Sequence, residues 1–430
     1  MKRIAAPTIL ASSLVPLAGL CIGGANAADW QWDPEVILSG NYNTNYGLES
    51  LNAQNVSVAG TSVDASLHAS VLDPTTQFDI TPRVRAVYYP GETEFDANDA
   101  YVNSQFQQTW QRANFSLNEL FWSQDVLQSF LPTTNIGTPL GQNSPGGDLA
   151  VVDERIRQNL LVLSPTATFD LSPRETLEIQ AGYLSVDYSQ AVVNQVENFK
   201  NYSGGVGLGF AVTAQSTVTV RVNDLDLKPE SGSTANTYGG EGEWRTHLSE
   251  VMQAYARLGL EHTTFGSVQY LSSVPGKSGG TSVTTTSGGP PVTSVSGGFG
   301  ISRKFVAYDL FADFARSVSP DSVGAVVARD DLRVRLEHKF SERTSGYVGL
   351  RGINQTALGN SVGFTAQRYG QAALGVEWRI FRQFSVISQY AYTTLKDANV
   401  PQAAGSNSVT ISLDYQPHRR TQESGVRIGY

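Results

Sequence analysis

The sequence predicts an all-β fold: a transmembrane, antiparallel, up-and-down β-barrel of about 18 strands (range about 16–19). Three observations support this prediction. Apolar and polar residues alternate along most of the chain, short turns alternate with longer polar loops, and aromatic residues gather near the expected strand ends. Such strands place an apolar face against lipid, and closure of the barrel satisfies every backbone polar group.

Residues 1–27 have the features of a secretory signal peptide. Lys2 and Arg3 form a basic start, an apolar stretch follows, and Ala25-Asn26-Ala27 is a cleavage site of the A-x-A type. We therefore expect residues 28–430 to form the mature chain, which folds as the barrel.

Composition excludes several classes of protein. Cys21 is the only cysteine and precedes the expected cleavage site, so the mature chain can form neither a disulfide nor a cysteine-ligated metal site. Removing the two basic residues of the signal peptide lowers the net charge from -9 to -11, which argues against a nucleic-acid partner. No mature segment approaches the ~18 uninterrupted apolar residues of a membrane helix, so a helical membrane protein is excluded.

The alternation is clearest in residues 252–261, 331–339, 371–380 and 409–415. A soluble sandwich would also alternate, but these strands run for about 10–15 residues, which matches a tilted membrane crossing. Because side chains alternate between the faces of a strand, we predict that Leu258 and Leu336 face lipid and that Arg257 and Arg335 face the lumen.

Turns and loops give the strand count. Short turns are expected around residues 73–75, 111–112, 171–174, 212–215, 248–250, 301–303, 340–343 and 381–382. Longer loops are expected around residues 45–58, 90–97, 125–155, 189–197, 228–236, 265–292, 318–327, 356–364 and 396–406. Two strands per long loop give about 18 strands, and an even count puts both ends of the barrel in the periplasm.

Two of these loops have unusual composition. Residues 278–296 contain only Gly, Ser, Thr, Val and Pro, which predicts a flexible surface loop. Residues 124–155 keep several apolar side chains, so this segment either packs as an extracellular loop or folds inward and narrows the lumen.

The C-terminus allows two interpretations. Residues 409–416 form a complete strand pattern, and Pro417 cannot continue a paired central strand, so we expect the last strand to end near Gln416 and residues 417–430 to form a periplasmic tail. Apolar residues alternate again between 422 and 430, and the chain stops on an aromatic residue. The alternative therefore makes residues 422–430 the closing strand, which resembles the signal that barrel-assembly machinery reads.

Several segments carry a family resemblance. They are Phe78-Asp79-Ile80-Thr81-Pro82-Arg83-Val84-Arg85, Tyr88-Tyr89-Pro90, Thr109-Trp110-Gln111-Arg112, Leu163-Ser164-Pro165 and Phe169-Asp170-Leu171-Ser172-Pro173-Arg174. In these segments the chain resembles a broad group of poorly characterised proteobacterial outer-membrane proteins. Relatives of that group include β-barrel porins encoded beside exopolysaccharide operons. The resemblance implies the outer membrane of a Gram-negative bacterium and a role in transport, but it assigns no site residues.

The polar strand faces provide the candidate lumen-lining residues: Arg83, Arg85, Arg221, Arg257, Arg333, Arg335, Arg351, Arg379, Glu178, Glu261, Glu337 and Glu377. Opposed rows of Arg and acidic residues can orient polar solutes in a wet channel, and the same residues can instead form ion pairs that brace the wall. We expect a porin-like channel for small polar solutes or saccharides. The alternative is a non-conducting structural or surface-interaction barrel.

Nothing in the sequence indicates catalysis, a cofactor or a metal. The histidines are His68, His247, His262, His338 and His418. In the Glu261-His262 and Glu337-His338 pairs, adjacent strand residues face opposite ways and cannot act together directly. We therefore expect no enzymatic activity, and we expect outer-membrane lipid, lipopolysaccharide and the barrel-assembly machinery as partners. The substrate, the ion selectivity and the oligomeric state do not follow from the sequence.

Overall fold

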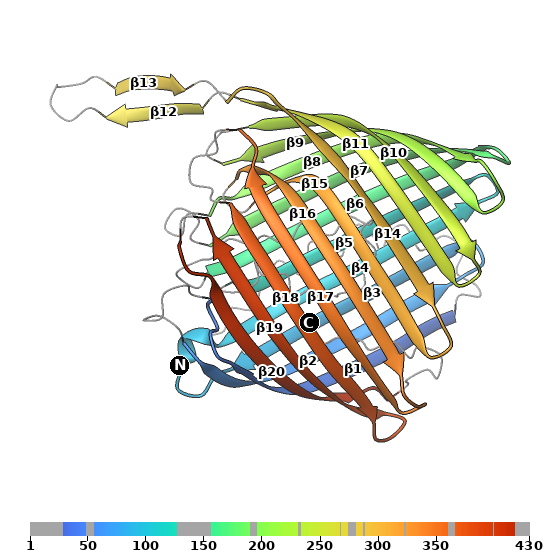
Figure 1. Ribbon diagram of the computed structural model, residues 1–430, viewed down its shortest axis with the longest axis vertical. Helices are drawn as coiled ribbons and strands as arrows, with labels where there is room; N and C mark the ends of the chain where they lie inside the picture. The colour runs from blue at the N-terminus through green and yellow to red at the C-terminus, as the bar shows by residue number, and fades with distance from the viewer. Residues whose placement is uncertain are drawn as a thin grey trace.

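The computed structural model describes residues 29–48, 56–126, 156–189, 196–230, 234–266, 268–273, 281–286, 289–321, 324–359, 366–398 and 400–417. In this part of the chain, 18 strands form one antiparallel sheet that closes on itself, because the last strand pairs with the first (Figure 1). The predicted fold class, an antiparallel β-barrel of about 18 strands, is confirmed.

The barrel strands follow one another in chain order around the wall. They are β1 (Asp29–Asn43), β2 (Val58–Leu72), β3 (Thr76–Tyr88), β4 (Ala97–Trp110), β5 (Ala113–Val126), β6 (Ile156–Ser172), β7 (Glu175–Tyr188), β8 (Phe199–Ala211), β9 (Ser216–Pro229), β10 (Ala235–Ser249), β11 (Met252–Phe265), β14 (Val292–Lys304), β15 (Tyr308–Pro320), β16 (Val326–Lys339), β17 (Thr344–Ala357), β18 (Gln367–Arg379), β19 (Phe384–Asp397) and β20 (Ala404–Tyr415). A short 3-10 helix, η1 (Thr93–Phe95), lies between β3 and β4.

The connections divide the barrel into a short-turn end and a long-loop end. At the short-turn end they are residues 73–75, 111–112, 173–174, 212–215, 250–251, 305–307, 340–343 and 380–383. β1 begins and β20 ends at this same end, as the even strand count predicts. The turn expected at residues 301–303 lies slightly later, because Ser302 and Arg303 continue the pairing of β14 with β11.

The predicted flexible loop at residues 278–296 is wrong in two places. β13 (Thr281–Thr286) pairs with β12 (Val268–Ser273) in a separate two-stranded sheet, and β14 already begins at Val292. Thr and Val favour strands, so they form paired segments between the flanking Gly and Ser residues. The β12–β13 hairpin projects beyond the barrel at the long-loop end (Figure 1).

Other predictions fall outside the described residues. These are the signal peptide, the inward or outward path of residues 127–155, and the role of residues 418–430. At the C-terminus β20 ends at Tyr415, close to the predicted end at Gln416. The barrel closes there, because residues 408–415 of β20 pair with residues 36–43 of β1.

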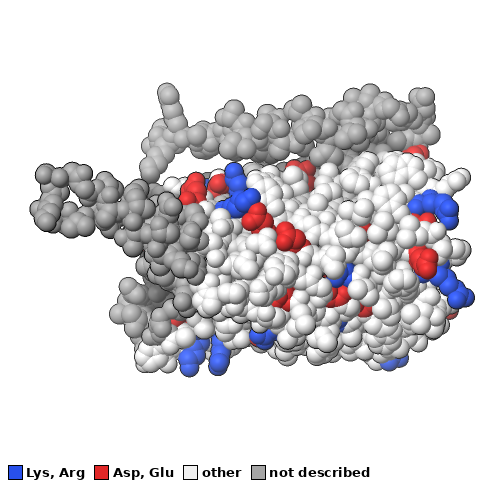
Figure 2. All heavy atoms as spheres, turned by 90° about the horizontal axis from the view of Figure 1, so that it is seen from above, with Lys and Arg blue, Asp and Glu red and all other residues white. Residues whose placement is uncertain are grey.

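The outer face of the barrel is apolar and ringed by aromatic residues at both ends. The exposed aromatic residues near the short turns include Trp30, Trp32, Trp110, Phe169, Trp244, Trp378 and Tyr415. Those near the long loops, which we call the outer tyrosine girdle, are Tyr42, Tyr88, Tyr202, Tyr238 and Tyr392. Between the rings lie exposed apolar side chains such as Leu258, and the outer face visible in Figure 2 is mostly uncharged, with few Lys, Arg, Asp or Glu side chains between the two ends.

These features place the protein in a membrane. Within the described ranges, no helix is long and apolar enough to cross one. A closed sheet leaves no unpaired strand edge, and an apolar belt between two aromatic girdles is the outer surface of a bacterial outer-membrane barrel. The chain is therefore an outer-membrane β-barrel of a Gram-negative bacterium.

Candidate functional site

All of the residues predicted to line the lumen lie on the inner side of the strands. Arg257 and Glu261, for example, alternate with Leu258 and Leu260, which are 69% and 61% exposed on the outside. Each of the other candidate residues is next in sequence to an apolar residue that is exposed on the outer face. These outer residues are Val84, Ile179, Val220, Val222, Leu332, Leu336, Leu350, Val376 and Trp378. Their part in solute passage stays a prediction, but the structure shows the contacts of several of them.

One inner charged group lies on β2, β3 and β4. The Arg83 guanidinium donates from Nε to Asp64 Oδ1 over 2.7 Å, and it stacks over the Tyr101 ring at 4.8 Å from the ring centroid. Arg85 lies opposite Asp99 in the β3–β4 register. Each arginine here therefore has an acidic residue on a neighbouring strand of the same wall.

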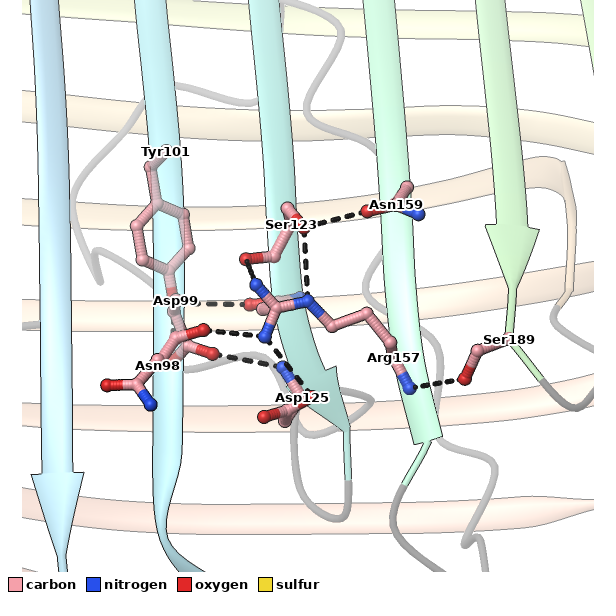
Figure 3. Close-up of polar contacts among 9 residues, drawn as sticks. Asn98, Asp99, Tyr101, Ser123, Asp125, Arg157, Asn159 and Ser189 are labelled. Carbon is pink, nitrogen blue, oxygen red and sulfur yellow. Dashed lines mark hydrogen bonds and ion pairs between the residues drawn. The ribbon is translucent and has the colours of Figure 1, made fainter. Parts of the chain in front are cut away.

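A second polar group adjoins the first at the long-loop end of β4, β5 and β6 (Figure 3). The β4–β5 backbone ladder stops at Ala100 and Ser123. Beyond it, the Asp125 N–H donates to Asp99 Oδ1 at 3.0 Å, and Arg157 Nη2 donates to the backbone carbonyl of Ser123 at 3.1 Å. Side chains thus replace the missing backbone hydrogen bonds and hold the strand ends together.

A third group spans β7 to β10. Arg221 donates from Nη1 to Glu241 Oε1 at 2.6 Å and from Nη2 to Glu178 Oε1 at 3.2 Å. Gly207 of β8 lies in register with both Glu178 and Arg221. Because Gly207 has no side chain, the arginine can cross β8 on the inner face to reach Glu178.

A buried set on β16 and β17, which we call the central arginine cluster, consists of Arg329, Asp331, Arg333 and Arg351. The Asp331 carboxylate accepts hydrogen bonds from the Nη2 atoms of Arg329, Arg333 and Arg351, at 3.2, 3.0 and 2.8 Å. The four side chains are no more than 5% exposed. One carboxylate therefore receives three guanidinium groups in a site that excludes water.

A transverse row of inner residues leads into this cluster. Tyr255, Gly300, Asp313, Arg333 and Arg351 are successive partners in register from β11 to β17. The Tyr255 hydroxyl donates to Asp313 Oδ2 directly above Gly300. A Cβ atom at Gly300 would come within 2.4 Å of the Tyr255 ring, so this contact requires glycine.

The remaining predicted residues lie nearer the short turns. Arg335 pairs with Glu337 at 3.1 Å and lies over the Tyr347 ring, 5.0 Å from its centroid. Glu377 is buried, and Arg379 follows it on the same inner face of β18.

The sequence prediction included two acidic partners of these arginines, Glu178 and Glu337, but missed the others. The structure adds Asp64, Asp99, Glu241, Asp313 and Asp331 to the inner charged residues. Alternation places Asp331 on the same polar face as Arg333 and Arg335, although Asp331 was not among the candidate lumen-lining residues. The Arg and acidic side chains that form ion pairs lie on the same or nearby strands of one part of the wall. They do not form two opposed rows that face each other across the lumen.

Apolar residues from opposite parts of the wall meet inside the barrel at the long-loop end. The inner faces of β6 to β10 contribute Ile156, Leu160, Val162, Val186, Tyr188, Phe199, Leu227 and Ala235 to one buried cluster. Val326 and Ala328 of β16 and Leu358 after β17 belong to the same cluster. Because β16 is not adjacent to any of β6 to β10 in the sheet, this apolar contact spans the lumen.

The contact forms because residues 317–321 and 324–329, which we call the in-folded hairpin, separate from β14, while β16 stays paired with β17 from Val327 onward. The pairing of β14 with β15 ends at Arg316, whereas β15 and β16 stay paired up to Pro320 and Val326. The Val318 backbone lies instead beside the Glu261 carboxylate of β11. At the tip, a Cβ at Gly324 would come within 3.2 Å of Pro229 at the end of β9, so the hairpin reaches the β8–β9 side of the mouth.

The inner wall of β8 to β11 changes from apolar and buried to polar and exposed along its length. Phe199, Leu227 and Ala235 are buried at the long-loop end. Toward the short turns, Ser203 and Arg245 share the same inner faces and are exposed. Water therefore reaches the lumen below the apolar contact.

The histidines lie in different parts of the barrel and do not form a common site in the described part of the chain. On the inside, His68 Nδ1 lies 3.0 Å from Thr81 Oγ1, and its Nε2 lies 3.5 Å from Asp79. This contact joins β2 and β3 where their ladder is interrupted near Pro82, which has no N–H. His262 packs against Tyr238 on the outside, whereas its neighbour Glu261 faces inward. His418 lies outside the described residues, and in the described ranges no group of three or more His, Cys, Asp or Glu could hold a metal ion.

Comparisons with known proteins do not assign this chain to a family. No family model matches the chain, and no curated protein sequence matches it. Among solved structures, the ferric-catecholate import receptor Fiu of E. coli is similar with a TM-score of 0.44 and 9% identity over 89% of this chain and 81% of that one. OccK2 (OpdF) of Pseudomonas aeruginosa is similar with a TM-score of 0.42 and 7% identity over 90% and 98%. Likenesses at this level do not indicate a substrate, and the resemblance to porins beside exopolysaccharide operons has no support from a family model.

Proposed function

We propose that the protein is an outer-membrane channel for small polar solutes, with its outer mouth narrowed by the in-folded hairpin. One observation carries the proposal: the inner wall is polar and exposed to water below the apolar contact. A barrel that served only as a structural element would gain more from an inner wall packed with apolar side chains, because burying charged groups costs free energy.

The inner charges suggest the type of solute. Arg and acidic groups of both signs lie close together, and the more exposed inner pairs, Arg245–Glu243 and Arg221–Glu178, offer hydrogen-bond donors and acceptors without one dominant charge. Such a surface suits neutral polyhydroxylated molecules, since Arg and carboxylate groups bind hydroxyls in complementary directions. Together with the resemblance to porins found beside exopolysaccharide operons, this leads us to propose saccharides as the solute class.

Planar-bilayer recording tests the channel. The mature protein should give discrete conductance steps, and the double variant Val326→Asp/Ala328→Asp should give larger ones. Two carboxylates in the apolar contact cannot stay buried without partners, so the in-folded hairpin should move away from the β6–β10 wall. The matched control Val326→Ile keeps the contact apolar and should conduct like the unaltered protein.

The alternative is a non-conducting barrel, and the apolar contact across the lumen favours it. A folded, heat-modifiable protein that stays silent, both unaltered and as the double aspartate variant, would establish this alternative. Steps that appear only in the variant would show that the hairpin closes the pore at rest. Liposome swelling with sugars of increasing size would then test the proposed solute class.

A further inference from the structure

Two basic residues face each other on the outside of the barrel without an acidic partner. Arg368 of β18 lies directly opposite Lys396 of β19, and both are exposed. They alternate with inner Tyr369 and Leu395, so their side chains lie on the outer face. Neither forms a hydrogen bond or an ion pair with any described residue. Like charges directly opposite each other destabilise a sheet, so this pair calls for an anion from outside the chain.

Three other basic residues at this end of the outer face form ion pairs with acidic residues. Their pairs are Arg157–Asp125 at 3.2 Å, Lys228–Asp226 at 2.7 Å and Arg316–Asp330 at 3.1 Å. Lys200 and Lys228 are also opposite each other, on β8 and β9, but Asp226 compensates Lys228. The Arg368–Lys396 pair thus differs from these three residues in the described part of the chain.

The position of Arg368 and Lys396 along their strands shows at which depth of the membrane the pair lies. Lys396 lies on the same outer face of β19 as Tyr392 of the outer tyrosine girdle, four residues closer to the long loops. Aromatic girdles mark the boundary between the hydrocarbon core and the headgroups. Arg368 and Lys396 therefore lie at the level of the outer-leaflet headgroups, where lipopolysaccharide carries its phosphate groups.

The surface next to the pair leaves room for a headgroup. Gly352 and Gly370 lie opposite each other on β17 and β18, two residues from Arg368 toward the barrel centre. A Cβ at Gly352 would meet nothing within 4 Å, whereas one at Gly370 would come within 3.2 Å of Thr394, so the open surface lies beside Gly352. A sugar ring bearing a phosphate could lie there beneath the two cationic side chains.

We propose that Arg368 and Lys396 bind a phosphate group of lipopolysaccharide in the outer leaflet. Arg offers a planar pair of donors and Lys a mobile ammonium, and the two together neutralise a phosphate at the membrane surface. The site is independent of any solute passage through the lumen.

The test measures how tightly the full-length mature barrel and its variants bind purified lipopolysaccharide in detergent. Native mass spectrometry and thermal shift give the affinities, which are then compared between the unaltered protein and the variants. The double variant Arg368→Gln/Lys396→Gln should bind about thirtyfold more weakly, from the usual contribution of two basic residues at an anionic surface. The matched control Arg343→Gln/Arg382→Gln removes two exposed charges from adjacent short turns and should bind normally. The charge-conserving variant Arg368→Lys/Lys396→Arg should keep most of the affinity.

Enzymatically dephosphorylated lipopolysaccharide and phosphatidylglycerol vesicles separate the sources of binding. Loss of affinity for the dephosphorylated lipid by the unaltered barrel, with little binding to the vesicles, supports the proposal. Equal binding of lipopolysaccharide to the unaltered and Gln variants would overturn it, and so would equal binding of the dephosphorylated lipid. Without lipid, the Gln variant should be at least as thermostable as the unaltered protein, because it removes a repulsion. A less stable variant in lipid-free detergent would show that the pair has a structural role instead.

Discussion

At the scale of single residues, the central arginine cluster illustrates how a barrel wall keeps charge inside a membrane. Three guanidinium groups surround the Asp331 carboxylate, and none of the side chains involved is more than 5% exposed. Burying these ions costs several kcal/mol per ion, on the order expected for any desolvated charge, and only their mutual contacts offset that cost. The cluster is therefore sensitive to the loss of its one carboxylate.

We expect Asp331→Asn to destabilise the folded barrel by about 3–5 kcal/mol, the usual result of removing one partner from a buried ion pair. Urea unfolding in detergent, followed by loss of heat-modifiable gel migration, measures this change. Asp226→Asn is the matched control. Its ion pair with Lys228 is exposed, so the loss should stay below about 1 kcal/mol. Equal losses in the two variants would contradict the dominant role of Asp331.

Gly300 gives a second prediction at this scale. Gly300→Ala places a methyl group against the Tyr255 ring and Asp313 Oδ2, which a Cβ would approach to 2.4 and 2.9 Å. Either the tyrosine moves or the strand shifts, and overpacking of this kind costs about 1–3 kcal/mol. Gly242→Ala on β10 is a suitable control, because a Cβ there meets nothing within 4 Å. The additional variant Gly300→Ala/Tyr255→Phe should recover little, whereas Gly300→Ala/Tyr255→Ala should recover packing.

At the scale of elements, alternation assigns each strand face, and β11 offers a direct check. Leu258 lies near the middle of this 14-residue strand and is 69% exposed on the outer face. Leu258→Arg should cost about 2–4 kcal/mol near the bilayer midplane, while Thr264→Arg near the end of the same face should cost about 0–1 kcal/mol. Unfolding of the two variants in lipid vesicles measures the difference. A Leu258→Arg barrel as stable as the unaltered one would contradict the position of β11 in the membrane.

Local sequence was enough to predict most strands, because a strand with one face in lipid must alternate. Arg257 and Arg335 were placed on the inner face from alternation alone. Partners on other strands were not predictable. A pair such as Arg221–Glu178 joins strands β7 and β9 across a glycine of β8, so it depends on the register of both pairings.

The in-folded hairpin marks a different limit of the sequence. Residues 318–327 were expected to form an ordinary long loop, and nothing in their composition indicates that they lie across the mouth. The arrangement depends on distant partners: Glu261 lies beside the Val318 backbone, and Val326 packs in the cluster that β6 to β10 provide. The β12–β13 hairpin was missed for a simpler reason, because its Thr-rich and Gly-rich segments were interpreted by composition alone.

At the scale of the whole molecule, closure links the ends of the chain. β1 is held on one side by β2 along its full length and on the other by β20 over residues 36–43. The Ser39 and Ser412 hydroxyls are 2.8 Å apart at this seam, and Asn45 Nδ2 donates to the Gly405 carbonyl at 3.2 Å. The seam therefore carries both backbone and side-chain hydrogen bonds, and these close the sheet over residues 36–43 of β1.

Because β20 already closes the barrel, deletion of Thr421–Tyr430 should leave a barrel of unchanged strand number. The truncated protein should be found in the outer membrane, migrate anomalously on unheated gels and unfold at the same urea concentration as the full chain. The matched control, Ile411→Pro in the closing strand, removes a ladder hydrogen bond and should prevent assembly. If the truncated chain is instead degraded in the periplasm, the purified, refolded protein decides the reason. A stable refolded barrel would assign residues 421–430 to recognition by the assembly machinery, whereas failure to refold would contradict closure by β20 alone.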